Sequence, residues 1–104
     1  MTVEIKIQIM ERAIELFKER GLFICIAVER AACDILDEVY ISDYYLAEML
    51  PELFKYKPKG LRVDVPWFDL DYSDDRRPVQ GGKFWKQRLR ILEKVLAELK
   101  EKVK

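Results

Sequence analysis

The sequence predicts a small, mainly α-helical domain. Its 104 residues match the usual size of one domain, so we expect residues 1–104 to fold as a single unit. Apolar residues recur at helical spacing in several stretches, whereas residues 51–82 lose this period and are punctuated by proline and glycine. We therefore expect three to four helices, a long aromatic and charged loop, and at most a short β element.

The first helix is predicted over residues 3–20. Thr2 is a suitable N-cap residue, and Gly21 is a typical residue at which a helix ends. The apolar positions have the i, i+3, i+4 spacing of an amphipathic helix. They are Ile7, Met10, Ala13, Ile14, Leu16 and Phe17.

The second element, residues 22–39, has two interpretations at its start. The apolar run from Leu22 to Val28 has the composition of a buried strand. The continuation through Ala31, Ile35 and Val39 restores a helical period, which favours one helix. Since this helix is apolar nearly all round at its start, we expect it to be the most buried element.

A short third helix is predicted at Tyr44 to Leu50. Ser42 or Asp43 caps it, and Pro51 ends it. The long loop that follows contains one alternating stretch, residues 61–65, which would form the short strand. Loops this long in small domains are usually functional or mobile.

The last helix is predicted from Lys83 to Lys104. Apolar residues step by four and three along it, at Trp85, Leu89, Leu92, Leu96, Leu99 and Val103. Such a seam fits a coiled-coil homo-oligomer through residues 85–103, or packing against the first two helices. Three heptads in so small a protein favour the intramolecular arrangement.

The composition excludes several kinds of enzyme. Histidine is absent, which removes Ser-His-Asp and Cys-His catalysis and histidine metal sites. Asp69-x-Asp71-x-x-Asp74 resembles the start of a calcium loop but lacks the glycine and glutamate of an EF-hand. We expect a protein that is not an enzyme and has no metal or cofactor. Nineteen basic and nineteen acidic residues also disfavour binding to duplex nucleic acid.

Targeting and cysteine use suggest a cytoplasmic protein. The N-terminal residues do not have the pattern of a secretory signal, and the longest apolar run is too short to cross a membrane. Cys25 and Cys33 would lie about 12 Å apart along one helix, too far for a disulfide, and resemble reduced core residues. The cytoplasm of an infected host fits equally well.

A basic cluster precedes and opens the last helix. Arg76, Arg77 and Lys83 flank two glycines at a helix N-terminus, where backbone N–H groups can bind an anion. These bases would hold the phosphate of a small phosphorylated or nucleotide ligand, and Tyr72 would stack on its base. The alternative is that the neighbouring aspartates compensate the basic charge within the chain.

Aromatic residues gather in the middle of the chain, where ten of the twelve lie between Tyr40 and Trp85. Tyrosine combines an apolar ring with a polar tip and is common at binding hot spots. We expect Tyr44 and Tyr45 to be exposed and to bind a protein partner. Asp74 and Asp75 of the charged loop would contribute to the same contact.

The order of these signals resembles one class of proteins. A helix is followed by Gly21 with a cysteine-containing apolar helix, by Pro51-Glu52-Leu53, by Trp67-Phe68 and by an arginine-bearing leucine helix. This layout, over about residues 21 to 96, is similar to that of small, uncharacterised phage and prophage accessory proteins. The resemblance implies a phage or mobile-element accessory protein and assigns no functional residues.

The sequence thus favours a non-enzymatic cytoplasmic protein that docks on a host or phage protein. One alternative is a protein that binds or sequesters a small phosphorylated or nucleotide ligand. A second alternative is a structural helical homodimer.

Overall fold

The computed structural model describes residues 1–55 and 80–104, and these residues are mainly helical. The helices are α1 (Val3–Arg20), α2 (Ile24–Leu36), α3 (Asp43–Met49), α4 (Pro51–Phe54) and α5 (Lys83–Glu101). No strand occurs within the two described ranges, which confirms the predicted helical class. The predicted strand at residues 61–65 lies outside them.

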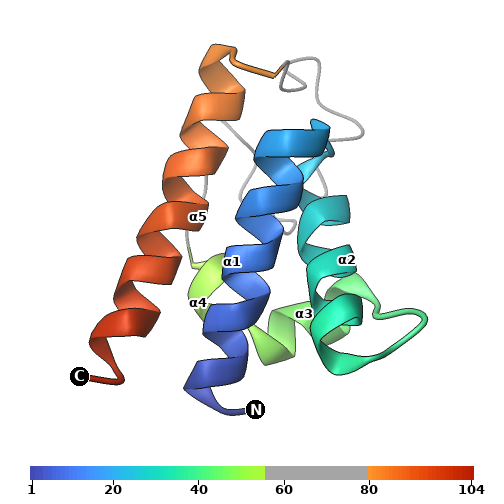
Figure 1. The fold of residues 1–104 in the computed structure, drawn as a ribbon, viewed down its shortest axis with the longest axis vertical. Coiled ribbons are helices and arrows are strands. Elements are labelled where there is room, and N and C mark those ends of the chain that lie inside the picture. Colours follow the sequence, from blue (N-terminus) through green and yellow to red (C-terminus); the bar gives the residue numbers. More distant parts are fainter. Residues whose placement is uncertain (56–79) are drawn as a thin grey trace.

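Helix α1 is the centre of the arrangement. It packs against α2 on one side and α5 on the other (Figure 1). The short helices α3 and α4 lie towards the end of the molecule where α1 begins, and the two termini lie at that same end (Figure 1). Residues near the start of α1 are therefore neighbours of the segment that follows α2.

The boundaries of α1 are those predicted from its capping residues. The Thr2 hydroxyl accepts a hydrogen bond from the Ile5 N–H at 3.2 Å. Gly21 ends the helix in the left-handed region, with φ of 64°, which glycine adopts without steric cost. The side chain of Gln80 donates to the Lys18 carbonyl at 2.7 Å, so a residue just before α5 caps the last turn of α1.

The helical interpretation of the second element is correct, but its predicted length is not. The helix begins at Ile24, and Asp37 ends it by adopting φ of 56°. Aspartate is among the few residues that enter this region readily, and the Glu38 N–H donates back to the Cys33 carbonyl at 3.0 Å. Six of the thirteen residues of α2 are buried, in keeping with its apolar composition.

The third helix is capped by Ser42, whose hydroxyl accepts from the Tyr45 N–H at 3.2 Å. It spans Asp43–Met49, one residue earlier at each end than predicted. Pro51 follows the end of this helix as predicted, but the long loop predicted from residue 51 does not begin there, because Pro51 opens α4. Proline fits the first position of a helix, where its missing N–H would have no intrahelical partner.

The apolar seam of α5 is used within the chain. Leu92, Val95 and Leu99 are fully buried in a single molecule, together with apolar residues of α1, α2, α3 and α4. This confirms intramolecular packing as the role of the seam. Val103, the last predicted seam position, follows the end of α5 and is 47% exposed.

An ion pair joins the beginning of α1 to α4. The Lys6 ammonium donates to both carboxylate oxygens of Glu52, at 3.0 and 2.7 Å, and both side chains are largely buried. Lys102, beyond α5, lies 4.0 Å from the same carboxylate. A charged cluster thus connects three segments that are distant in the sequence.

Candidate docking surface

Large apolar side chains are exposed mainly in one short segment. Val39, Tyr40, Tyr44 and Tyr45 are 101%, 70%, 83% and 53% exposed, respectively. The only other exposed large hydrophobic side chains within the described residues are Met1 and Val103, at the two ends of the chain. We call Val39, Tyr40, Tyr44 and Tyr45 the aromatic surface. It confirms the predicted exposure of the two tyrosines at the start of α3.

The structure holds this segment at defined points. Asp37, in the left-handed conformation, turns the chain out of α2. Ile41 is buried between the two exposed pairs and anchors the segment to the core. Ser42 then starts α3, so that Tyr44 and Tyr45 occupy its first turn while Leu46 faces the core.

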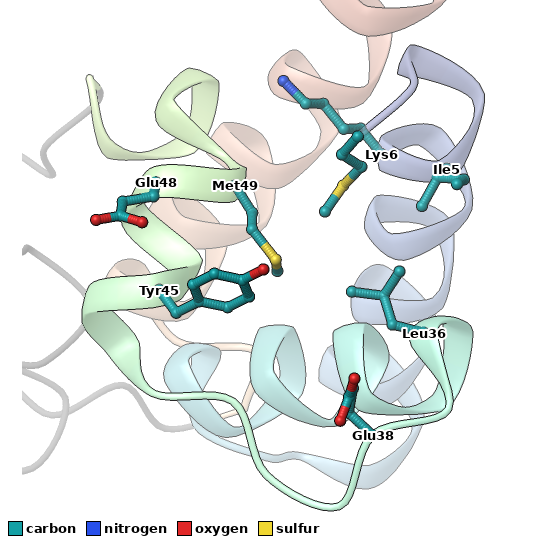
Figure 2. Close-up of a pocket in the computed structure, with 8 residues that line it drawn as sticks. Ile5, Lys6, Leu36, Glu38, Tyr45, Glu48 and Met49 are labelled. Atoms are coloured by element: carbon teal, nitrogen blue, oxygen red, sulfur yellow. The ribbon is translucent and has the colours of Figure 1, made fainter.

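A pocket of about 490 Å³ adjoins the aromatic surface. Three segments contribute to it: the start of α1, the end of α2 with the residue after its cap, and α3 (Figure 2). Its lining residues are Met1, Ile5, Lys6, Leu36, Glu38, Tyr45, Glu48 and Met49. Tyr45 belongs to both features, so the aromatic surface and the pocket form one continuous site.

The side chains around the pocket divide into an apolar interior and a polar margin. Figure 2 shows Leu36 and Met49 directed into the pocket and the Tyr45 ring reaching towards Met49. The Glu38 carboxylate is also directed towards the pocket, whereas Glu48 points away from it (Figure 2). The site therefore offers apolar contact beside one inward-facing carboxylate.

The side-chain charge at this site is negative once the internal ion pair of Lys6 is counted. Lys6 lines the pocket, but its ammonium points away and is bonded to Glu52 (Figure 2). Neither Glu38 nor Glu48 forms an ion pair in the part of the chain that the structure describes. Two acidic groups are thus left to interact with a ligand or partner.

The pKa of the Glu52 carboxyl is shifted by its ion pair with Lys6, which we call the Lys6–Glu52 clamp. Burial by itself raises its pKa, but hydrogen bonds from Lys6 and from its own backbone N–H, with the charges of Lys6 and Lys102, outweigh that effect. The net result is a lowered pKa, which keeps Glu52 ionised and paired with Lys6 at neutral pH.

The two cysteines are free thiols, as expected from their spacing on α2. Cys25 is buried and Cys33 is half-buried. Burial raises the pKa of the Cys33 thiol, and the nearby charges of Glu29, Asp34 and Glu38 raise it further. A thiol with a raised pKa is a poor nucleophile at neutral pH.

The predicted ligand-binding residues and two of the predicted partner-binding residues, Asp74 and Asp75, have no described side chains. Tyr72, Asp74, Asp75, Arg76 and Arg77 lie outside the described residues, as does the aspartate run that resembled a calcium loop. Lys83 begins α5, but its side chain is likewise outside the described part. The phosphate-binding interpretation therefore stays a prediction.

One basic residue of α5 differs from the sequence interpretation. The sequence places Arg88 among the basic residues of the first two turns of this helix, yet its side chain is fully buried. It lies on the same helix as Trp85, whose ring is stacked on Phe17 of α1. Arg88 is therefore part of the interior rather than of a surface that attracts anions.

The pocket itself was not predicted from the sequence. Its apolar walls are Ile5, Leu36 and Met49, three residues that the helical period places on the inner faces of separate helices. The available signal was the exposed aromatic and acidic stretch after α2, which identifies the segment but not the cavity beside it.

Comparisons with known protein families, with curated proteins and with solved structures give no match to this chain. Within residues 1–55 and 80–104, no helix is both long enough and apolar enough to cross a membrane. The same described residues contain no group of three or more metal-ligating side chains arranged to hold an ion.

Proposed function

We propose that this chain is a non-enzymatic binding protein that docks on a protein partner through the aromatic surface and its adjoining pocket. The observation that supports this most strongly is the exposure of four large apolar side chains within seven residues, beside a cavity. In the phage or mobile-element setting that the sequence resembles, the partner would be a host or phage protein in the cytoplasm.

Tyr44 and Tyr45 have the chemistry of interface anchors. Each ring can bury a large apolar area while its hydroxyl keeps a hydrogen-bond partner, and such residues dominate binding energies. Contiguous exposed apolar side chains on a small domain commonly mark an interaction site. The aromatic surface has this character in the described part of the chain.

The local structure lowers the entropic cost of docking. Ile41 is buried and Ser42 caps α3, so the backbone that carries Tyr44 and Tyr45 is held before a partner arrives. A preorganised surface loses less conformational freedom on binding than a disordered one.

A protein partner is favoured over a lipid surface by the charges next to the rings. Asp37 and Glu38 precede the aromatic surface and Glu48 follows it. Cellular membranes present anionic headgroups on their cytoplasmic side and would repel these carboxylates. A folded partner can place a basic group opposite them.

Selection of a displayed random-peptide library on the immobilised full chain tests this function. Peptides that bind the site should lose at least tenfold in affinity, measured by fluorescence anisotropy, against the Tyr44→Ala/Tyr45→Ala variant. The matched control is Glu19→Ala/Arg20→Ala, which truncates two exposed side chains of opposite charge at the far end of α1.

The control variant should bind like the parent chain, and both variants should keep its helical circular dichroism, because all four side chains are exposed. Peptides that bind the Tyr44→Ala/Tyr45→Ala variant as tightly as the parent would overturn the proposal. Binding to anionic vesicles in place of peptides would also contradict it.

A further inference from the structure

We propose that the pocket beside Tyr45 receives a lysine or arginine side chain of the partner protein. This inference rests on the proposed docking function, and it specifies the residue that the partner inserts. Three features of the pocket support it: its size, its apolar interior and the position of the Glu38 carboxylate.

The pocket is large enough to admit one long side chain. The pocket has a volume of about 490 Å³, which is towards the lower end of ligand-binding cavities. Its lining residues come from three segments that meet at one end of the molecule (Figure 1). The pocket is partly open to solvent, and it shares Tyr45 with the aromatic surface. A single inserted side chain with its adjoining backbone fits within this volume.

The interior suits the aliphatic part of such a side chain. Ile5, Leu36 and Met49 provide apolar walls. Methionine is flexible and adapts to the shape of a guest, while lysine and arginine carry three or four methylene groups that pack on apolar surfaces. The stem of a basic residue would therefore lie against these walls.

The margin suits a cationic head group. Glu38 directs its carboxylate towards the pocket and has no ionic partner within the described residues (Figure 2). The Tyr45 ring, which also lines the pocket, can interact with a cation through its face. Lys6 does not oppose this, because its ammonium is turned away and bonded to Glu52.

Other occupants fit less well. An acidic side chain would meet Glu38 and add like-charge repulsion. A purely apolar side chain would cover the Glu38 carboxylate and remove water from it without supplying a partner, which costs free energy. A positively charged residue with a long apolar stem can pack its stem against the apolar walls and pair its charge with Glu38.

The first test uses the peptides selected on the full chain. Those that depend on Tyr44 and Tyr45 should contain a lysine or arginine, and replacing that residue by its neutral isostere, norleucine or citrulline, should weaken binding about tenfold. Glu38→Gln in the protein should weaken binding of the unsubstituted peptides about fivefold. Glu19→Gln removes the same charge at the far end of α1 and should have no effect.

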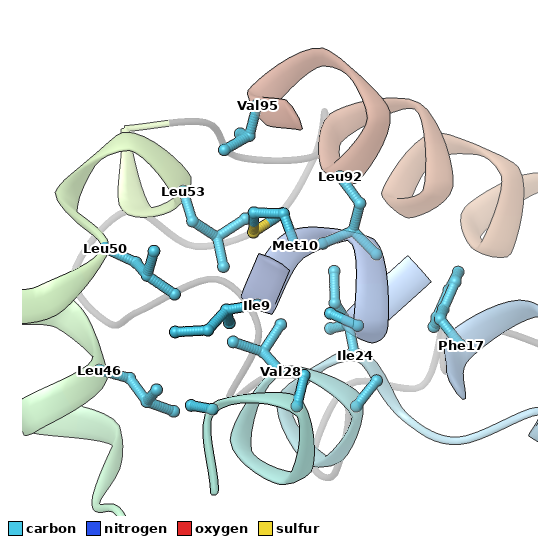
Figure 3. Packing of buried hydrophobic residues seen from close by; sticks show 14 of the residues in the cluster. Ile9, Met10, Phe17, Ile24, Val28, Leu46, Leu50, Leu53, Leu92 and Val95 are labelled. Carbon is cyan, nitrogen blue, oxygen red and sulfur yellow. The ribbon is translucent and has the colours of Figure 1, made fainter. Parts of the chain in front are cut away.

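The second test does not depend on any selected peptide. The chain has three methionines, so its ¹³C-methyl spectrum holds three signals from that residue type. Butylguanidinium should shift the Met49 methyl saturably, whereas its neutral isostere butylurea and the anion pentanoate should shift it far less. Met10 is fully buried in the core between the helices and provides an internal control that should not move (Figure 3).

The outcomes separate the two proposals. Peptides that depend on Tyr44 and Tyr45 but lack a basic residue, or that are insensitive to Glu38→Gln, would overturn the basic-residue inference and leave the docking function standing. Equal Met49 shifts with butylurea and butylguanidinium would overturn it as well. Peptides whose affinity is unchanged by Tyr44→Ala/Tyr45→Ala would overturn the docking function, whatever the methyl spectra show.

Discussion

The indole ring of Trp85 stacks on the ring of Phe17, with centroids 5.3 Å apart and planes inclined by 11°. Phe17 lies in the last turns of α1, and Trp85 lies in the first turn of α5. Together with the Gln80 side chain on the Lys18 carbonyl, the stack fixes the start of α5 against the end of α1. The apolar face of α5 consequently covers the core of its own chain.

Removing the Trp85 ring should therefore destabilise the domain substantially. We expect Trp85→Ala to lower the free energy of unfolding by about 3 kcal/mol, because the stack and the packing of a large side chain are both lost. Trp85→Phe, which keeps an aromatic ring on Phe17 and leaves a smaller cavity, should cost less than Trp85→Ala. Urea unfolding followed by circular dichroism measures both. Equal stabilities of Trp85→Ala and the parent would contradict this role.

The Lys6–Glu52 clamp predicts a specific dependence of stability on pH. The pKa of Glu52 is lowered from its ordinary value of 4.5, so its contribution is complete above that pH and is lost as the pH falls through the lowered value. Glu52→Gln should cost about 1–3 kcal/mol at pH 7, and its stability should converge with that of the parent once the pH falls below the lowered pKa of Glu52.

A matched control for the clamp is Glu101→Gln. Glu101 pairs with Lys104 at 3.1 Å, but both side chains are more than two-thirds exposed. An exposed pair of this kind contributes little, so this variant should stay within about 0.5 kcal/mol of the parent. Parallel pH profiles for Glu52→Gln and the parent would exclude the clamp as the source of the dependence.

Gly21 combines a left-handed backbone with a close neighbour. A Cβ placed there would lie 3.0 Å from the Gln80 Oε1, whereas no described atom lies within 4 Å of a Cβ at Gly81, which also has positive φ. Gly81→Ala should cost about 1–2 kcal/mol, the strain of the conformation alone. Gly21→Ala should cost more, because it also displaces the amide that caps α1.

A double-variant cycle isolates this contact. In a Gln80→Ala background, the penalty of Gly21→Ala should fall to that of Gly81→Ala, as measured by urea unfolding. An unchanged Gly21→Ala penalty in that background would show that Gln80 does not limit the space at Gly21.

The cysteines should react slowly in the folded protein. Since burial and three nearby carboxylates raise the pKa of Cys33, little thiolate is present at pH 8, and alkylation by iodoacetamide should be several-fold slower than in the unfolded chain. Cys25 is buried and should react only after unfolding. Mass spectrometry of peptides from a time course separates the two sites. Alkylation of Cys33 at the rate seen in urea would contradict the raised pKa.

Local signals predicted the long helices well. The spacing of Met10, Ala13 and Phe17, with Thr2 and Gly21 at the ends, specified α1 because capping and periodicity act within one segment. The same holds for the inward face of α5 at Leu92, Val95 and Leu99.

Features that depend on other parts of the chain were less predictable. Pro51 was interpreted as the end of the third helix and the start of the long loop, but proline also suits the first position of a helix, and here it opens α4. Asp37 ends α2 through its backbone conformation, which the continuing apolar period did not reveal. The burial of Arg88 depends on tertiary packing rather than on the local charge pattern.

The candidate site was predictable only where it depends on one segment of the chain. The exposure of Tyr44 and Tyr45 was expected because tyrosine combines an apolar ring with a polar tip and both residues lie in the aromatic stretch. The pocket required the start of α1 to meet the end of α2, so the proximity of Ile5, Glu38 and Met49 became visible only in the fold.

The footprint of a selected peptide on the protein tests the docking surface most directly. In ¹⁵N-labelled full chain, titration with a peptide obtained by library selection should perturb the amide signals of residues 36–49 and those at the start of α1. The signals of the last turns of α1 and the middle of α5 should remain in place. Saturable perturbations confined to α5 or to the far end of α1, with residues 36–49 unchanged, would contradict the proposed docking surface.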